Sequence, residues 1–323
     1  MAARIALAFL VASLAAAAAQ AQTWPSKPVR YVVPFPPAGA TDILARIMAE
    51  RISGPLGQPI VVENRAGASG NIGVEAAARS APDGYTLFLG NIGTIAVNPA
   101  VFPKLAVNPR TDLAAVIQVV DVPSVLVANG AFSANSVKEL VALAKASPGK
   151  LNYGSPGSGS VNRLEMELLR IAEGLDMVHV PYKGGAGPAV AGLMGGETHV
   201  MFTTAASAIG QVRGGKLKLL AVTSPRRMEQ APSAPTMVES GYPDFVTGSW
   251  QGVFVPAGTP RDVVERLFTA IQSTMRTAEV AERLKNGGAE VVTSPTPAAF
   301  AEFVAAEAQR WSRVVRESNA TVD

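Results

Sequence analysis

Short runs of β-branched residues alternate with amphipathic stretches along most of this 323-residue chain. Such alternation is typical of a mostly parallel sheet with helices on both faces. The chain is also too long for one ordinary core. It therefore predicts an α/β fold with one large lobe or two moderate lobes.

The same patterns place the individual elements. The predicted strands are 29–33, 60–63, 85–89, 116–120, 125–128, 151–153, 177–180, 199–202, 217–222 and 252–255. The predicted helices begin at 41 or 42 and at 161, and span 71–79, 136–145, 261–276 and 298–316. The residues expected on buried helix faces are Ile43, Leu44, Ile47, Met48 and Ile52 in the first helix and Phe300, Phe303, Val304, Trp311 and Val315 in the last.

Two stretches of sequence separate the predicted strands of one lobe from those of the other. Residues 121–124 separate two apolar runs, and the proline-rich stretch 225–243 is expected to bring the chain back. We therefore predict a first lobe formed by residues 23–122 and 226–323. Residues 123–225 are expected to form the second lobe.

The N-terminus has the pattern of a secretory signal peptide. Arg4 precedes an apolar run, 5–19, that only Ser13 interrupts, and a small-x-small triplet ends at Ala21. The run is too short for a membrane-spanning helix. We expect residues 1–21 to be removed during export to the periplasm, and a buried N-terminal helix is the alternative.

Composition excludes several classes of function. Charged residues make up 16% of the chain, its formal net charge is +3, and Lys and Arg form no phosphate-reading cluster. No nucleic-acid partner is therefore expected. The chain has no cysteine, which excludes thiolate catalysis, iron–sulfur clusters and cysteine zinc sites. His179 and His199 are its only histidines, and no carboxylates are spaced to share a metal with them, so we expect no metal and no cofactor.

Two predicted loops share one design. Residues 34–42 and 154–160 each follow a strand and run into a helix, and neither loop contains Lys or Arg. Ligands of open α/β sheets bind outside the carboxyl ends of the strands. A helix N-terminus there offers unpaired N–H groups and a partial positive charge. The loops therefore predict an anion-binding site to which each lobe contributes one loop. The alternative is that the two loops are only stiff connectors between a strand and a helix.

Three more strand ends fit the same scheme, and they are 90–94, 181–185 and 203–207. Each is a weak indication alone, because Gly-rich strand ends are common in sheets. Together they could line the same cleft between the lobes.

The sequence contains no complete form of the enzyme motifs that it most nearly matches. Residues 210–216 have the Gly-x4-Gly-Lys spacing of a phosphate loop, but a leucine follows where Ser or Thr is required and no strand precedes it. No serine lies in a Gly-x-Ser-x-Gly elbow. The competing class is a secreted hydrolase with Ser155 or Ser158 as nucleophile. That enzyme would need His179 or His199 beside the serine.

Seven segments, several of them six or more residues long, match one known family in the expected order. They are PFPPAGATD (34–42), VVENR (61–65), APDGY (81–85), KLNYGS (150–155), HVPYKGG (179–185), LAVTS (220–224) and PAGTP (256–260). On these segments the chain resembles the Bug (Bordetella uptake gene) receptors, the TctC-like substrate-binding proteins of tripartite tricarboxylate transporters. The resemblance implies a periplasmic-binding-protein type II fold, with two doubly wound lobes joined by a hinge and a ligand cleft between them. It also implies no catalysis.

The resemblance further implies where a ligand is held. In the family, backbone amides and ordered waters hold a ligand carboxylate at the first loop, here 36–42, and the loop 155–162 faces it. Asn91 and Thr94 match further cleft positions. With the strand ends, the predicted ligand-binding residues are Phe35, Pro36, Pro37, Ala38, Gly39, Ala40, Thr41, Asp42, Asn91, Thr94, Ser155, Gly157, Ser158, Gly159, Ser160, Asn162, Tyr182, Lys183, Thr203 and Thr204.

Departures from the family pattern leave the identity of the ligand open. They are Ala38 for a frequent glycine, Arg163 for a histidine, 203–205 for an Asp-Asn pattern, and 248–251. The expected ligand is a small carboxylate, either a di- or tricarboxylate, an amino acid or an aromatic acid. The expected partners of this monomer are transporter permease subunits, or a sensor kinase if it is an orphan receptor.

Overall fold

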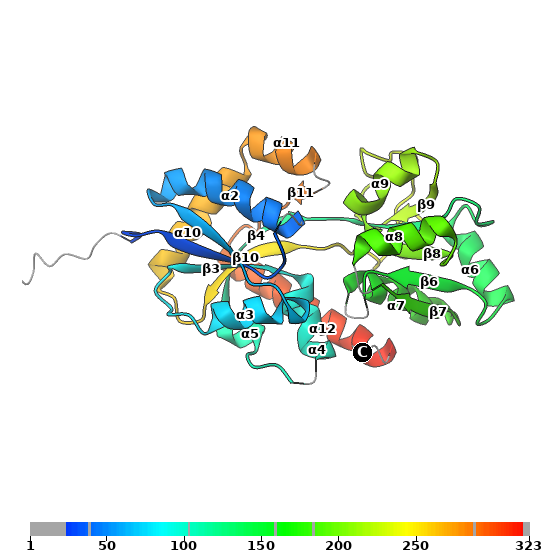
Figure 1. Ribbon diagram of the computed structural model, residues 1–323, viewed down its shortest axis with the longest axis horizontal. Coiled ribbons are helices and arrows are strands. Elements are labelled where there is room, and N and C mark those ends of the chain that lie inside the picture. The colour runs from blue at the N-terminus through cyan, green and yellow to red at the C-terminus, as the bar shows by residue number, and fades with distance from the viewer. Residues whose placement is uncertain are drawn as a thin grey trace, which may run out of the picture.

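The computed structural model describes residues 24–37, 40–102, 104–157, 160–182, 185–286 and 289–318. They form two sheets with helices on both faces, and Figure 1 shows the two resulting lobes next to each other. The predicted signal peptide lies outside the described residues. Within those ranges, no helix is long and apolar enough to cross a membrane.

The first lobe is built on a six-stranded sheet with the order β11-β4-β10-β3-β1-β2. Its strands are β1 (Val29–Val33), β2 (Ile60–Asn64), β3 (Thr86–Asn91), β4 (Leu113–Asp121), β10 (Gln251–Pro256) and β11 (Glu290–Val291). β1 pairs in parallel with β2 and β3, whereas β10 is antiparallel to β3 and β4. The carboxyl ends of β1, β2 and β3 therefore share one edge of the sheet.

The second lobe has a five-stranded sheet with the order β7-β6-β8-β5-β9. Its strands are β5 (Ser124–Asn129), β6 (Asn152–Ser155), β7 (Val178–Pro181), β8 (Val200–Thr204) and β9 (Leu217–Val222). β6 pairs in parallel with β7 and β8, and β5 is antiparallel to β8 and β9. β10 and β5 are the strands that the chain enters from the other lobe, which explains why they run against their neighbours.

Helices cover both faces of each sheet, as the alternating pattern predicts. In the first lobe, α2 (Ala40–Leu56), α10 (Arg261–Met275) and α11 (Ala278–Asn286) share one core, and α3 (Asn71–Ala78), η2 (Gly93–Val97), α4 (Asn98–Val101) and α12 (Pro297–Ser318) share the other. In the second lobe, the two cores contain α6 (Val137–Ala146) with α7 (Val161–Glu173) and α8 (Ala186–Gly195) with α9 (Ala205–Arg213). The short helices η1 (Ala68–Gly70) and α5 (Pro109–Asp112) complete the fold.

Two side chains that were predicted to be buried are exposed. Ile43 is 51% exposed, because the buried face of α2 is centred on Leu44 and Met48 and a residue one position away points elsewhere. Phe303 is 37% exposed at the margin of its core, where its ring meets Trp250 edge-on with centroids 5.7 Å apart. The other residues predicted for these two faces are buried.

Two chain segments join the lobes, and they pair with each other. The amide of Ser249 donates to Val122 O at 2.9 Å, and the amide of Val122 donates to Ser249 O at 3.3 Å. Pro123 faces Gly248 across an antiparallel bridge. These four residues, named the hinge ribbon below, form the only backbone passage between the two sheets in the described chain.

The segment before the return crossing packs on the second lobe. Met237 and Phe245 are buried in a second-lobe core, and the amide of Met237 donates to Val222 O at 2.8 Å. These contacts correct the predicted boundary at residues 225–226, because the apolar side chains keep this segment on the second sheet. We place the boundary at the hinge ribbon instead.

A helix pair also spans the lobes. Val161 and Leu164 of α7, in the second lobe, share a buried cluster with Trp311 and Val315 of α12, in the first. The lobes are therefore connected both by the hinge ribbon and by this helix contact.

Candidate ligand-binding site

The carboxyl ends of the parallel strands mark the predicted site on each lobe. They are Val33, Asn64 and Asn91 in the first lobe and Ser155, Pro181 and Thr204 in the second. Figure 1 shows that α2 and α8 begin on the side of their lobe that faces the other lobe. These strand ends therefore lie where open α/β sheets bind ligands.

A polar clamp shapes the first-lobe loop ahead of α2. Asn64 donates through Nδ2 to Phe35 O at 3.0 Å and to Asp42 Oδ1 at 2.8 Å. Asp42 is buried, and its Oδ2 accepts from Arg46 Nε at 2.9 Å. This hydrogen bond raises the pKa of Arg46. Because the Asp42 carboxylate is engaged within the protein, we interpret it as a positioning residue and not as a ligand contact.

The other described residues of this loop differ in exposure. Phe35 is half-buried and Pro36 and Pro37 are exposed, whereas Thr41 is buried. α2 begins at Ala40, so the amides of its first turn lie at the strand edge. Backbone donors, and not charged side chains, are what this loop offers to a ligand.

Asn91 and Thr94 form a closed turn after β3. The amide of Thr94 donates to Asn91 Oδ1 at 2.9 Å, and the amide of Asn91 donates to Thr94 Oγ1 at 3.0 Å. Thr94 is buried, and a Cβ added to Gly70 would lie 2.6 Å from its methyl carbon. This close approach brings the segment before α3 to the same strand edge.

That segment, residues 67–71, was not predicted as part of the site. Ala68 and Ser69 have φ values of 47° and 55°, a left-handed conformation that is costly for residues with a Cβ. Asn98 holds the segment by donating through Nδ2 to Ser69 O at 3.0 Å. Its sequence, Gly-Ala-Ser-Gly-Asn before a helix, repeats the glycine–serine pattern of the second-lobe loop and could have indicated it.

Neutral groups fix the conformation of the second-lobe loop that precedes α7. Ser155 Oγ donates to Gly157 O at 3.0 Å, and Ser160 Oγ donates to the same oxygen at 2.8 Å. Ser160 is the N-cap of α7 and accepts from the amide of Arg163 at 3.3 Å. Gly157 has a φ of 133°, which only glycine adopts readily. The loop is thus held in place by hydroxyl groups and a glycine.

His179 lies beside this loop. Its Nε2 is 2.7 Å from Ser155 Oγ, and its ring stacks on Tyr153 with centroids 5.0 Å apart. The spacing is that of a serine–histidine pair, but Ser155 is fully buried and its hydroxyl is already engaged within the loop. A buried hydroxyl cannot reach a substrate, so we interpret this contact as loop positioning. His199 instead contacts the side chain of Asn152, at the start of β6.

Other predicted second-lobe residues have partners within the protein or are buried. Thr203 is fully buried in β8, so its side chain presents no surface to a ligand, which corrects that prediction. Tyr182 donates through its hydroxyl to Glu197 at 2.9 Å, and Thr204 Oγ1 lies 2.8 Å from Ser207 Oγ. The remaining predicted residues Ala38, Gly39, Ser158, Gly159 and Lys183 lie outside the described residues.

Asn162 faces the hinge and not the loop. It is buried, and its Nδ2 donates to Ser124 Oγ at 3.0 Å and to Glu165 Oε2 at 2.9 Å. Across the described ranges, no group of three or more His, Asp or Glu side chains is placed to hold a metal ion. Among the described residues, amides, hydroxyl groups and helix N-termini are the donors at these strand ends, and they suit an anion.

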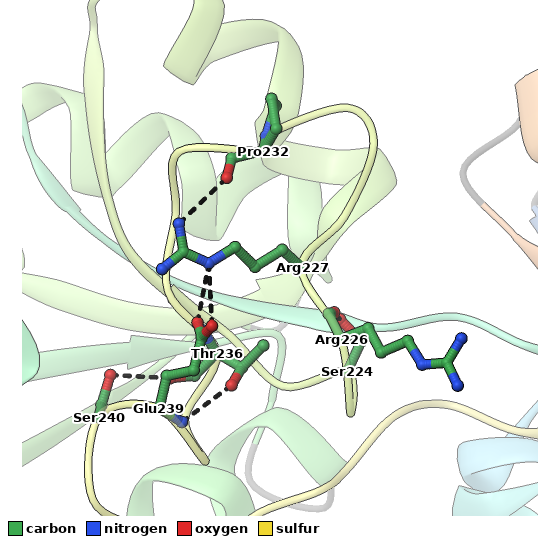
Figure 2. Close-up of polar contacts among 7 residues, drawn as sticks. All are labelled: Ser224, Arg226, Arg227, Pro232, Thr236, Glu239 and Ser240. Carbon is green, nitrogen blue, oxygen red and sulfur yellow. Dashed lines mark hydrogen bonds and ion pairs between the residues drawn. The ribbon is translucent and has the colours of Figure 1, made fainter.

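Charged side chains gather at another place between the lobes. The loop after β9 and the end of α11 line a cavity of about 540 Å³, across which Lys285 Nζ contacts Glu229 at 2.5 Å. Figure 2 shows Arg227 held by Glu239, whereas the side chain of Arg226 extends away from them. The described residues of the predicted ligand loops do not line this cavity. We interpret it as an ionic contact between the lobes.

Comparison with known proteins decides the family. The family model described as the tripartite tricarboxylate transporter family receptor matches residues 44–320. The chain belongs to this receptor family. The resemblance noted in the seven sequence segments is thereby confirmed.

Known members of the receptor family are similar over nearly the whole chain. Protein BugT of Bordetella pertussis is 39% identical over 313 residues, which are 97% of this chain and 95% of BugT. The structure of R. palustris Rpa4515 with adipate is 34% identical, with a TM-score of 0.81 and coverage of 93% of this chain and all of that one. MatC from Rhodopseudomonas palustris with bound malate is 34% identical, with a TM-score of 0.77 and coverage of 90% and 100%. The predicted two-lobed periplasmic-binding-protein fold is confirmed.

Proteins of this receptor family bind solutes and are not enzymes, as the structural neighbours described as a periplasmic transporter and a periplasmic binding protein illustrate. The hydrolase alternative therefore has no support from the relatives. The contact between His179 and Ser155 is consistent with this conclusion, because it lies beneath the loop and not at its surface.

Proposed function

We propose that this receptor captures a small carboxylate between its lobes and delivers it to the permease of a tripartite tricarboxylate transporter. The observation that carries the proposal is that strand ends in both lobes run into helix N-termini, at α2 and α3 on one side and α7 and α8 on the other. Relatives with adipate and with malate bound support the carboxylate class. A monomer that is exported by its signal peptide suits this role.

Neutral donors are sufficient for such a ligand. A hydrogen bond to a charged group contributes about 1.5–3 kcal/mol, and a helix N-terminus adds about 0.3–2 kcal/mol for a nearby anion. After the costs of association and lobe ordering, four or five such contacts leave about −8 kcal/mol, which corresponds to micromolar affinity. No arginine at the strand ends is needed.

The ligand would connect the lobes through its two polar ends. We assign one end to the loop 35–42 with Asn91, and the other to the loop 155–160. Because each end then interacts with a different lobe, binding favours the closed arrangement over the open one. The permease, or a sensor kinase in the alternative, would recognise that arrangement.

A thermal-shift screen tests the proposal. The purified protein is heated with adipate, malate, citrate, glutamate or benzoate, and each acid is matched by the amide in which every carboxylate is replaced by a neutral group. At a hundred times its Kd, a true ligand stabilises the protein by about 2.7 kcal/mol. We expect at least one acid, and none of the amides, to raise the melting temperature. If a sugar or an organic cation raises it while every carboxylate fails, the proposed ligand class is wrong.

A further inference from the structure

Two carboxylic acids lie at the hinge, and each has one oxygen without a partner. Asp121 ends β4 directly before the hinge ribbon, and Glu165 of α7 is fully buried. Asp121 Oδ1 and Glu165 Oε1 are both buried and make no hydrogen bond to any described residue. An ionised carboxylate in such a position loses its hydration without replacement, so these oxygens require an explanation.

Asp121 packs directly against the hinge ribbon. A Cβ added to Gly248 would lie 2.3 Å from Asp121 Oδ1, so only glycine leaves room for this carboxyl group. Glu290 stands opposite Asp121 in the β11–β4 pair. Burial, with Glu307 and Glu290 in addition, raises the pKa of Asp121 to about 6, although the amide of Val122 opposes the shift.

Glu165 lies behind the two crossing segments. Asn162 donates to its Oε2 at 2.9 Å and to Ser124 Oγ, just beyond the ribbon, at 3.0 Å. The hydroxyl of Thr247, just before the ribbon, is buried and also makes no hydrogen bond within the described chain. Burial raises the pKa of Glu165 to about 7, while the hydrogen bond from Asn162, the nearby hydroxyl groups of Thr247 and Ser124 and the charge of Arg310 oppose the shift.

Besides Glu290 of β11, the charged groups that face these acids come from α12 of the first lobe. Arg310 donates to Val246 O at 2.8 Å and thus reaches the second-lobe segment. Glu307 accepts from the indole of Trp250 at 3.2 Å and lies 3.7 Å from Arg310. Any rotation of one lobe against the other therefore changes the surroundings of Glu165 from both sides.

We propose that Asp121 and Glu165 make the hinge proton-linked, so that both carboxyl groups are neutral while the hinge is dry and lose their protons when lobe motion lets water reach it. A protonated Glu165 has an O–H that can donate to the hydroxyl of Thr247, which lies beside it. A neutral acid also removes the repulsion between Asp121 and the two glutamates that face it. A proton thus gives Glu165 a hydrogen bond to Thr247 and removes from Asp121 a buried charge that has lost its hydration.

The direction of the pH effect follows from linkage. Because the dry hinge binds protons more tightly than a hydrated hinge, raising the pH shifts the population away from the arrangement in Figure 1. Each acid changes the ratio of the two arrangements by at most about tenfold per pH unit, between its hydrated and its buried pKa. This inference concerns the motion of the empty receptor and does not depend on the identity of the ligand.

Single-molecule Förster resonance energy transfer can measure the populations of the dry-hinge and the hydrated-hinge arrangements of the lobes. The chain has no cysteine, so Lys138→Cys on α6 and Glu265→Cys on α10 place one dye on an exposed position of each lobe. Without ligand, we expect the population ratio to change at least fivefold between pH 5 and pH 8. Glu165→Gln, which keeps the shape of a neutral acid, should remove most of that change.

Two further variants make the result decisive. Glu167→Gln is the matched control, because Glu167 is buried on the same helix but paired with Arg170 and Tyr153 inside the second lobe. It should keep the wild-type response. Asp121→Asn should reduce the response as well, and it decides the question if Glu165→Gln does not fold. Equal wild-type ratios at both pH values, or a full response in both hinge variants, would overturn the proposal.

Discussion

The loop ahead of α2 is held by a buried carboxylate, whereas the loop ahead of α7 is held by hydroxyl groups and a glycine. In the first lobe, Asp42 binds both Arg46 and Asn64. In the second lobe, Ser155 and Ser160 converge on the carbonyl oxygen of Gly157. Both arrangements present the N-terminus of a helix at the carboxyl end of a parallel strand.

A loop can therefore hold a helix N-terminus at a strand end with or without a charged group. A charge-assisted clamp contributes more per contact but depends on a buried anion. A neutral loop contributes less per contact and depends on a backbone conformation that glycine provides. The two lobes should therefore respond differently to substitution.

The largest effect is expected from Asp42→Ala. The change removes two hydrogen bonds to a charged group, and we expect it to lower the free energy of unfolding by about 3 kcal/mol. Urea denaturation would measure this loss. Ser155→Ala, the counterpart in the second lobe, removes only neutral hydrogen bonds and should cost less than half as much. Equal losses of stability in the two variants would contradict the proposed difference between the two loops.

The second-largest effect is expected from a change of pH, which acts on the two acids at the hinge between the lobes. The folded-state pKa values of Asp121 and Glu165 are raised to about 6 and about 7, above their unfolded values, so the folded state holds extra protons. Their stabilising contribution is complete below the unfolded pKa values and is lost as the pH rises through 6 and 7. We expect stability to fall by about 2 kcal/mol between pH 6 and pH 8. Denaturation of Glu165→Gln should show a smaller fall.

A third prediction separates helix capping from ligand binding. Ser160→Ala removes the N-cap of α7, and Ser136→Ala removes the N-cap of α6, which lies away from the strand ends. Each should cost about 1 kcal/mol of stability in urea denaturation. Only Ser160→Ala should also weaken the binding of whichever carboxylate the thermal-shift screen identifies, as measured by calorimetry. A similar loss of affinity in Ser136→Ala would remove the assigned role of the second loop.

The smallest effect is expected at the ionic contact outside both loops. Lys285 and Glu229 pair across the lobes, but their side chains are 50% and 77% exposed. Exposed pairs contribute about 0–1 kcal/mol, and salt screens them. Lys285→Ala should therefore shift the energy-transfer ratio by less than threefold, and the shift should vanish in 1 M NaCl. A larger or salt-resistant shift would show that this contact, and not the loops, governs closure.

Much of the fold was predictable because apolar periodicity is a local property. The predicted strands 29–33 and 217–222 coincide with β1 and β9, and Ser136 caps α6 as expected. α8 and α9 were not predicted, because their many small residues give little apolar periodicity. The return crossing was placed too early, since proline content does not reveal that Met237 and Phe245 pack on the second sheet.

The site was predictable at the level of loops but not of side chains. The two loops and their helices lie at strand ends as predicted. The orientations of Asp42, Asn162 and Thr203 were not accessible from local sequence, because each is fixed by burial or by a partner distant in the chain. The segment 67–71 was not predicted, although its glycines and serine resemble those of the loop 154–160.

Four features follow from the amino-acid sequence alone. They are the alternation of strands and helices, the glycine- and proline-rich strand ends, the absence of thiol chemistry and the resemblance to one receptor family. These features are local or compositional, so they can be read without coordinates. None of these features indicates that His179 lies against Ser155, which the tertiary structure shows. Nor do they indicate that Asp121 Oδ1 and Glu165 are buried at the hinge, beside Gly248 and Thr247. The physical reason is that desolvation and hydrogen bonding act between groups that are close in space, and these groups come from segments far apart in the chain.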